Sequence, residues 1–403
     1  MTRVLAAAFL VVLSLAAPAR AHVVEAGTDL RITQTFAAGE VTFAIAGVSQ
    51  VPAPLRVSAR ASRPMSLELE LRSLTDGTTA TGSVATGREP AALPAVHAGP
   101  HELRVQVGDE VSVIPFRVLV PTSALWTMVM DGAFLVSGLL LVGVVLANGR
   151  SRLVVAGASA AASVAIALIL LSPYLPPARP EGAAPVAEPG RPYAQGRFST
   201  LPARPATGTE FALLLHLVDG ATGRPVDDLA VHHEATVHLV VTSRDGAVFR
   251  HVHPLRTAPG VLTVRLRVPR PGRYLAHAEI ERQGSGGQLL SGAFEVAGEP
   301  RPDAPSQQAA APRLVPSAPT AGSPVTIEIG ADGPIQPWLG MPGHLIVRSR
   351  DGGHLAHAHG TAAGESVLRF TLTFPERGRY LAWAQYAQEG RLMTRPFTME
   401  VQR

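Results

Sequence analysis

Apolar and polar residues alternate in short runs along residues 22–120, and clusters of turn-forming residues separate the runs. Alternation with a period of two is typical of a strand that buries one face. Several such runs at regular spacing predict an antiparallel β-sandwich, so the expected fold class is mainly β. The predicted strands are Leu30–Phe36, Val41–Ala46, Leu55–Ala59, Ser66–Leu71, Glu102–Val107 and Val111–Val118.

Two later segments are apolar without alternation, Leu125–Ala147 and Leu153–Leu171. At about 1.5 Å of rise per residue, each is long enough to cross about 30 Å of hydrocarbon as a helix. Arg150 and Arg152 lie in the short connection between them, and such arginines are typical of the cytoplasmic side. The pattern predicts a transmembrane hairpin with both flanking regions outside. Asp131, near the outer end of the first helix, is expected to reach interfacial water.

Residues 1–21 have the pattern of a signal peptide, with an apolar stretch and a cleavage site that ends at Ala21. The predicted location is therefore the cytoplasmic membrane, with two passes and both large domains outside, in the periplasm or the extracellular space. Cleavage after Ala21 makes His22 the first residue, and a free amine beside an imidazole is a strong pair of ligands for copper or nickel. Cleavage after Ala19 is the alternative, as is a His22 that merely comes first.

Residues 206–403 contain an internal repeat with an offset of 106 residues. His238 to Gly246 reads HLVVTSRDG, and His344 to Gly352 reads HLIVRSRDG. The expected architecture is a set of immunoglobulin-like antiparallel β-sandwiches beside the two-helix hairpin. The predicted domains are a signal peptide at 1–21, an N-terminal β-sandwich at 22–120, a transmembrane helical hairpin at 125–171 (helices 125–147 and 153–171), a proline-rich linker at 173–205, a first β-sandwich repeat at 206–298, a linker at 299–313 and a second repeat at 314–403.

Each repeat predicts a hairpin, because an Asp-Gly pair between two apolar strands is a strong signal for a two-residue turn. With Asp245-Gly246 as that turn, His238 lies opposite His253, and Val240 lies opposite His251. Directly opposed residues and alternate residues of a strand share one face. Three imidazoles therefore converge in the first copy, and the same arithmetic brings them together in the second.

The candidate metal ligands are these repeated histidines, and imidazole at such spacing suits copper, zinc or nickel. The thioether of Met341, just before the second set, favours copper. The alternative is that the histidines are partly buried strand residues bonded to the backbone. The candidate ligands are His238, His251, His253, His344, His357, His359, Met341 and His22, with His232, His233, His277 and His354 as further possibilities.

Composition excludes several other functions. The chain has no cysteine, which rules out disulfides, thiol catalysis and cysteine-ligated metals. The net charge of +4 is small for 403 residues, so nucleic acid is not an expected partner. The sequence has no Gly-rich phosphate loop and no nucleophile elbow, so we expect neither an enzyme nor an organic cofactor.

The first repeat contains the segments Gly208 to Asp219, Gly223-Arg224-Pro225-Val226, His232 to Ser243, Phe249 to Pro254 and Pro271-Gly272-Arg273-Tyr274. In these segments it resembles the YtkA-like family of exported immunoglobulin-like domains. The second repeat is similar but lacks the Gly-x-Pro-Val stretch and the proline after its His-x-His. The resemblance implies an exported domain often associated with heavy-metal or respiratory-oxidase biology, without an assigned active site.

Two functions follow as hypotheses. The first is a membrane-anchored metal-binding protein, with copper favoured, that buffers, delivers or senses the ion through its two histidine clusters. Its expected partners are the cytoplasmic membrane and a membrane protein complex or metal transporter. The second is a non-catalytic assembly protein whose β-sandwiches dock on another membrane protein while the histidines are structural.

The predicted topology can be tested with reporter fusions. Fusions after Val120 and after Pro205 should be active only outside the membrane, and a fusion at Gly149 only inside, because the short loop carries two arginines. An active external reporter at Gly149 would contradict the hairpin.

Overall fold

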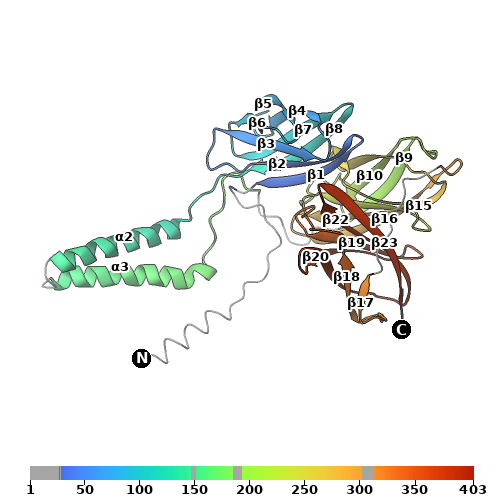
Figure 1. Cartoon of the computed structure of the whole chain (residues 1–403). Coiled ribbons are helices and arrows are strands. Elements are labelled where there is room, and N and C mark those ends of the chain that lie inside the picture. Colours follow the sequence, from blue (N-terminus) through green and yellow to red (C-terminus); the bar gives the residue numbers. More distant parts are fainter. Residues whose placement is uncertain (1–26, 28, 147–150, 185–192, 302–311) are drawn as a thin grey trace.

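The computed structural model describes residues 27, 29–146, 151–184, 193–301 and 312–403. The predicted signal peptide, His22 and the reporter position at Gly149 lie outside the described residues. The described chain is mainly β, with antiparallel sheets throughout and two long helices, which confirms the expected fold class. Figure 1 shows the sandwiches gathered together and the helices extending away from them as a hairpin.

The N-terminal domain is a sandwich of two four-stranded antiparallel sheets, ordered β1-β2-β3-β6 and β5-β4-β7-β8. Its alternating strands place side chains such as Phe43, Val57 and Leu103 in one core. β5 and β6 are additional to the predicted strands, because their small and polar residues give weak alternation. The strands are β1 Leu30–Phe36, β2 Gly39–Ile45, β3 Ala53–Ala61, β4 Ser66–Ser73, β5 Thr79–Ala85, β6 Ala91–Ala95, β7 Gly99–Val107 and β8 Glu110–Val118.

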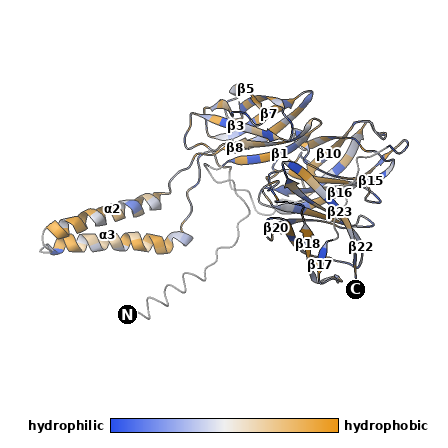
Figure 2. Cartoon of the chain, viewed as in Figure 1, coloured by the Kyte–Doolittle hydropathy of each residue, from blue (hydrophilic) through white to orange (hydrophobic). Residues whose placement is uncertain are grey.

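The helices α2 (Leu125–Leu146) and α3 (Arg152–Leu171) pack on each other, and the short 3-10 helix η1 (Ser172–Tyr174) follows. Ser137 donates a hydrogen bond from its hydroxyl to the carbonyl of Ala158 at 3.1 Å. Apolar residues cover the hairpin along its length, as Figure 2 shows. By length and composition, both helices could cross a membrane.

The first repeat consists of two four-stranded sheets, ordered β13-β14-β10-β9 and β12-β11-β15-β16. It begins at β9, inside the stretch predicted as linker, because β9 pairs with β10 along eight residues. Most prolines of the predicted linker come before β9. The first repeat therefore begins before residue 206, the start that the sequence predicts. The strands are β9 Ala194–Leu201, β10 Phe211–Asp219, β11 Val237–Ser243, β12 Phe249–Val252, β13 Leu255–Ala258, β14 Val261–Leu266, β15 Gly272–Arg282 and β16 Gly286–Val296.

The second repeat forms one seven-stranded sheet, ordered β17-β18-β21-β20-β19-β22-β23. A single residue accounts for the difference. Pro254 has no backbone N–H and separates β12 from β13, whereas Gly360 lets β20 continue from β19 to β21. The strands are β17 Arg313–Val315, β18 Pro324–Gly330, β19 Gly343–Ser349, β20 Leu355–Ala362, β21 Val367–Thr373, β22 Gly378–Gln388 and β23 Arg391–Val401.

The two hairpins have the predicted register but longer turns. Val240 pairs with His251 in the first repeat, and His344 pairs with His359 in the second. In the first, the backbone N–H of Ser243 donates to the carbonyl of Val248 at 3.0 Å, so four residues rather than two form the loop. Two extra residues leave the register unchanged because one is added on each side of the turn.

The corner at the start of β15 and β22 is held by a tyrosine hydroxyl. Tyr274 donates to the carbonyl of Arg270, and Tyr380 to that of Glu376, each at 2.8 Å. His101 starts β7 in the same position, where it is buried and its Nδ1 lies 3.0 Å from the carbonyl of Gly99. His101 therefore has a structural role at this corner.

The two repeats are not isolated, because the outer face of β11 packs against the outer face of β19. Val240 and Ile346 lie in a separate apolar core that joins the repeats. Trp383 stacks on Phe249 across this interface, with ring centroids 4.7 Å apart and planes 13° apart. All seven residues of β11 are therefore buried. The sequence-based view of two independent sandwiches misses this contact.

The N-terminal domain docks on the same assembly. The backbone N–H of Thr35 donates to the carbonyl of His253 at 2.8 Å, and the N–H of His253 donates to the Thr35 hydroxyl at 2.9 Å. Arg265 of the first repeat forms an ion pair with Asp109 at 2.6 Å. All three sandwiches consequently meet beside the histidines of the first repeat.

Removing the aromatic contact between the repeats should destabilise their packing. We expect Trp383→Ala to lower the free energy of unfolding by about 3–5 kcal/mol, because a buried indole leaves a cavity. Leu392→Ala is the matched control, since Leu392 is 42% exposed and its loss should change stability by less than about 0.5 kcal/mol. Urea titration measures both; equal effects would show that the interface contributes little.

Candidate metal centre

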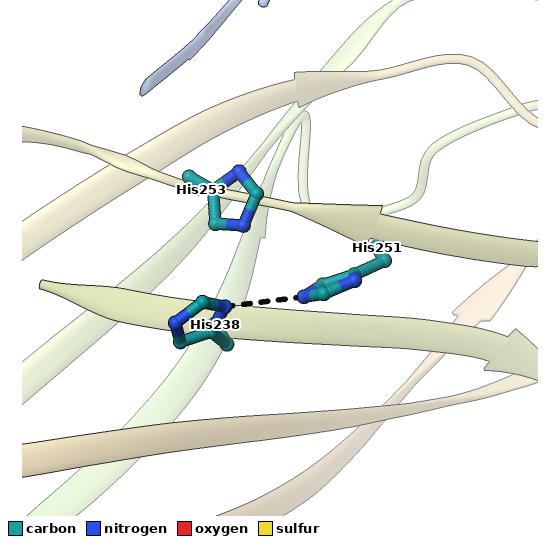
Figure 3. A group of neighbouring side chains, drawn as sticks. All are labelled: His238, His251 and His253. Atoms are coloured by element: carbon teal, nitrogen blue, oxygen red, sulfur yellow. Dashed lines mark hydrogen bonds between the residues drawn. The ribbon is translucent and has the colours of Figure 1, made fainter. Parts of the chain in front are cut away.

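The structure brings together the two predicted histidine triads. His238, His251 and His253 each offer one nitrogen, and these three nitrogens lie within 4.8 Å of one another. His344, His357 and His359 meet the same criterion in the second repeat. Figure 3 shows the first triad, with His238 on β11 and the other two on the neighbouring chain segment. Each triad could hold a metal ion.

The two triads are neighbours across the interface between the repeats. The ring centroid of His357 lies 5.0 Å from that of His238 and 5.2 Å from that of His251. His251 and His344 have centroids 6.2 Å apart. The six histidines therefore form one centre at the junction of the repeats, rather than two remote sites as the tandem sequence suggests.

Each triad is oriented by a side chain of the other repeat. Nδ1 of His251 lies 2.9 Å from Oε1 of Gln385, and Nδ1 of His357 lies 2.7 Å from Oε2 of Glu279. Glu279 and Gln385 occupy equivalent positions in the two repeats, 106 residues apart. Hydrogen bonds of this kind fix the tautomer of a ligating histidine and increase its basicity when the partner is a carboxylate.

The N-terminal domain supplies a third orienting group. Oε2 of Glu40 lies 3.0 Å from Nδ1 of His253, and Oε1 accepts a hydrogen bond from the indole N–H of Trp338 at 2.8 Å. Glu40 faces Thr35 across the β1–β2 hairpin, so one end of this hairpin makes all these contacts. The carboxylate links the N-terminal domain to both repeats.

Counting protons shows that the second triad lacks one. Nε2 of His344 lies 3.0 Å from the carbonyl of Trp338, Nδ1 of His344 lies 2.9 Å from Nε2 of His357, and Nδ1 of His357 faces Glu279. These three contacts each require one proton, but two neutral rings carry only two. With the carbonyl and carboxylate accepting at the ends, two nitrogen lone pairs face each other in the middle.

The first triad has the same deficit as long as Gln385 presents its amide oxygen to His251, as it does here. Nε2 of His238 lies 3.0 Å from the carbonyl of His232, and Nδ1 of His238 lies 3.3 Å from Nε2 of His251, whose other nitrogen faces Gln385. A cation between the two facing nitrogens removes the repulsion in each triad. That cation is either a metal ion or an additional proton.

Burial opposes the additional proton. It lowers the pKa of His238 and His251 well below the usual value, and neighbouring histidines lower it further. The same causes bring the pKa of His344 to about 2 and that of His359 to about 3. These four histidines are therefore neutral at pH 7, which is the form that binds metal ions. Nε2 of His253 and Nε2 of His359 are also buried without a hydrogen-bond partner.

The other predicted ligands lie differently. Met341 is in a turn whose backbone bonds to Trp338, and no hydrogen bond joins its sulfur to a histidine among the described residues. His277 bonds to the hydroxyl of Ser291, and burial lowers the pKa of His277 to about 4. His354 lies in the second Asp-Gly turn against Tyr380, away from the triads. The His232 ring lies between the triads, with its centroid 6.5 Å from that of His238 and 6.1 Å from that of His359, and the His233 ring lies 3.7 Å from that of His359.

Sequence reasoning missed Glu40, Glu279, Gln385 and Trp338. The equivalence of Glu279 and Gln385 can be found from the sequence, because they are 106 residues apart. Each follows the segment at the start of β15 or β22 that repeats with this same offset. Glu40 has no such signal, because its role depends on how a separate domain docks.

Comparisons with known proteins bear on the repeats. Residues 195–297 and 315–403 match a family described as Domain of unknown function (DUF8832). The two matched segments correspond to the two repeats, and the resemblance to the YtkA-like family stays a prediction. No curated protein matches the chain.

Similar solved structures are multidomain β-proteins with low TM-scores, and at these values they carry no argument about function. The tetra-tandem repeat in the extending region of a large adhesion protein is 10% identical, covers 94% of this chain and 92% of its own, and has a TM-score of 0.19. The chicken CNTN1 FN1-FN3 domains are 9% identical, with 94% and 98% covered and a TM-score of 0.17. The two fibronectin type-III domain segment from chicken tenascin is 12% identical, with 52% and 98% covered and a TM-score of 0.16.

The lowered pKa values predict acid sensitivity of the metal-free protein. Below pH 6.5 the unfolded chain binds protons at histidines that stay neutral when folded, so stability falls with pH. Each such histidine costs about 1.4 kcal/mol per pH unit until its folded pKa is reached. Thermal unfolding of the metal-free protein between pH 8 and pH 5 measures the slope.

His344→Asn serves as the control because it removes one of these titrating rings, and its slope should be shallower. A melting temperature that stays constant over this range in the original chain would show that the rings are protonated in the folded state.

Proposed function

We propose that this chain is a membrane-anchored protein that binds two metal ions outside the cytoplasmic membrane, one at each triad. The observation that carries the proposal is the pair of facing nitrogens in each triad, 3.3 Å apart in one and 2.9 Å in the other, with outer nitrogens already committed to oxygen acceptors. Neutral, buried and oriented imidazoles are a ligand set for an ion.

Copper is the favoured ion, with zinc and nickel as the alternatives. Among divalent ions, nitrogen ligands bind copper most tightly. Three histidines with an open fourth position also suit zinc. Met341 lies in the turn that precedes His344, and its thioether stays a predicted ligand that favours reduced copper.

The location of the centre supports a role in buffering, delivering or sensing the ion beside the membrane. The described helices are apolar enough for two membrane passes, and the positions of Val120 and Glu181 bring the ends of the hairpin together. A membrane complex or a metal transporter is the partner that such a position suits.

The alternative is an assembly protein with structural histidines. It predicts folding and docking without any ion. It requires an additional proton in the second triad, where the carboxylate of Glu279 accepts, and a donating amide of Gln385 or an additional proton in the first. Metal titration therefore separates the two functions.

Titration calorimetry of the full chain in detergent should show two ions of copper, zinc or nickel bound per chain. Changing His238, His251 and His253 to alanine should remove one ion, and the equivalent change in the second triad should remove the other. His216→Ala is the control, since His216 lies on β10 away from both triads. No binding of any of the three metals, or an unchanged stoichiometry, would refute the proposal.

Glu279→Gln provides a finer arm of the same experiment. It keeps the hydrogen-bonding shape but removes the carboxylate that faces His357, so affinity at the second triad should fall about 10–100-fold. The first triad should keep its affinity, because Glu279 does not face its Nδ1 atoms.

A further inference from the structure

The two ends of the histidine centre are closed to different degrees. At the first triad, the side chain of His253 is only 1% exposed, because Glu40 and Trp338 cover it. At the second triad, His359 is half-buried, whereas His344 is fully buried. The second end of the centre is therefore less covered than the first, although Nε2 of His359 itself is buried.

The difference arises at equivalent turns of the two repeats. The turn at His232–Ala235 in the first repeat corresponds to the turn at Trp338–Met341 in the second, and both are closed by paired backbone hydrogen bonds. The Trp338 ring lies 6.0 Å from that of His253, and the His232 ring lies 6.1 Å from that of His359. The two turns thus occupy equivalent positions in the repeats, but they carry different side chains.

His233 continues this arrangement outward. Its ring centroid lies 3.7 Å from that of His359 and 4.0 Å from that of His232. Both His232 and His233 are half-buried, so they contact solvent on one side and the triad on the other. Where the first end of the centre has an indole and a bonded carboxylate, the second end has two more imidazoles.

We propose that His232 and His233 form the access port through which metal ions enter and leave the centre. The proposal rests on the metal-binding function proposed above. An ion exchanges its ligands from an external donor to these half-exposed imidazoles, then to His359 and the second triad. The first triad fills from the second, because His357 lies next to His238 and His251 while Trp338 and Glu40 close the other side.

The port differs from a third binding site. Its two histidines are needed for the rate of exchange and not for the number of ions held, since each triad already has three nitrogens within 4.8 Å. Their loss should therefore slow transfer in both directions without changing affinity.

The test compares the full chain in detergent with the double variant His232→Ala, His233→Asn. Asparagine is chosen because His233 has a φ of 46°, which asparagine adopts more readily than alanine. Both proteins are loaded with two equivalents of copper, and transfer to a coloured chelator is followed by stopped flow. We expect the double variant to keep two ions and to release them at least about tenfold more slowly, which corresponds to about 1.4 kcal/mol in the barrier.

Two further variants make the result specific. His216→Ala is the matched control and should leave the rate unchanged. Trp338→His places an imidazole at the closed end and should accelerate release from the first triad. An unchanged rate in the double variant overturns the port, and so does the loss of an ion, which would make the two histidines ligands. If the original chain binds no metal, the proposed function fails and the port fails with it.

Discussion

The packing of β11 against β19 is the contact on which the rest of the structure depends. It buries a face that would be exposed in an isolated sandwich, and the histidines lie on that face beside Val240 and Ile346. Burial keeps the imidazoles neutral and lets each repeat present Glu279 or Gln385 to the other. A single repeat has the three histidines but lacks the group that orients the middle one. The duplication therefore makes a centre that one copy cannot make alone.

Departures from the repeat symmetry determine how the copies differ. Pro254 divides a sheet that Gly360 keeps continuous. Glu279 gives the second triad a carboxylate partner, whereas Gln385 gives the first a neutral one, and the first obtains its carboxylate from Glu40 instead. The first triad consequently takes its carboxylate from the N-terminal domain, and the second takes its carboxylate from the adjoining repeat.

Much of the fold could be predicted from the sequence because it follows from local pattern. The helices begin and end within one residue of the apolar segments, and the hairpin register follows from the position of Asp-Gly even though the turn is longer. The packing of the two repeats on each other is indicated only weakly by the sequence pattern. Val240, Ile346 and Trp383 lie on the face that a solvated sheet would make polar, and continuous apolar strands are typical of burial on both faces. Glu40 could not be predicted, because an exposed strand glutamate looks the same whether or not another domain meets it.

The chain path explains how the N-terminal domain reaches the centre. Val120, just before the helices, and Glu181, just after them, exchange backbone hydrogen bonds at 3.1 and 3.0 Å. The hairpin therefore returns the chain to its starting point, and the first repeat emerges beside the N-terminal domain. An ion that binds only the docked arrangement stabilises that arrangement by mass action. Because Glu40 contacts His253 and Trp338 together, the same linkage works in reverse, and displacement of the N-terminal domain weakens the first triad before the second. The order of the domains along the chain thus brings the N-terminal domain against the histidine centre.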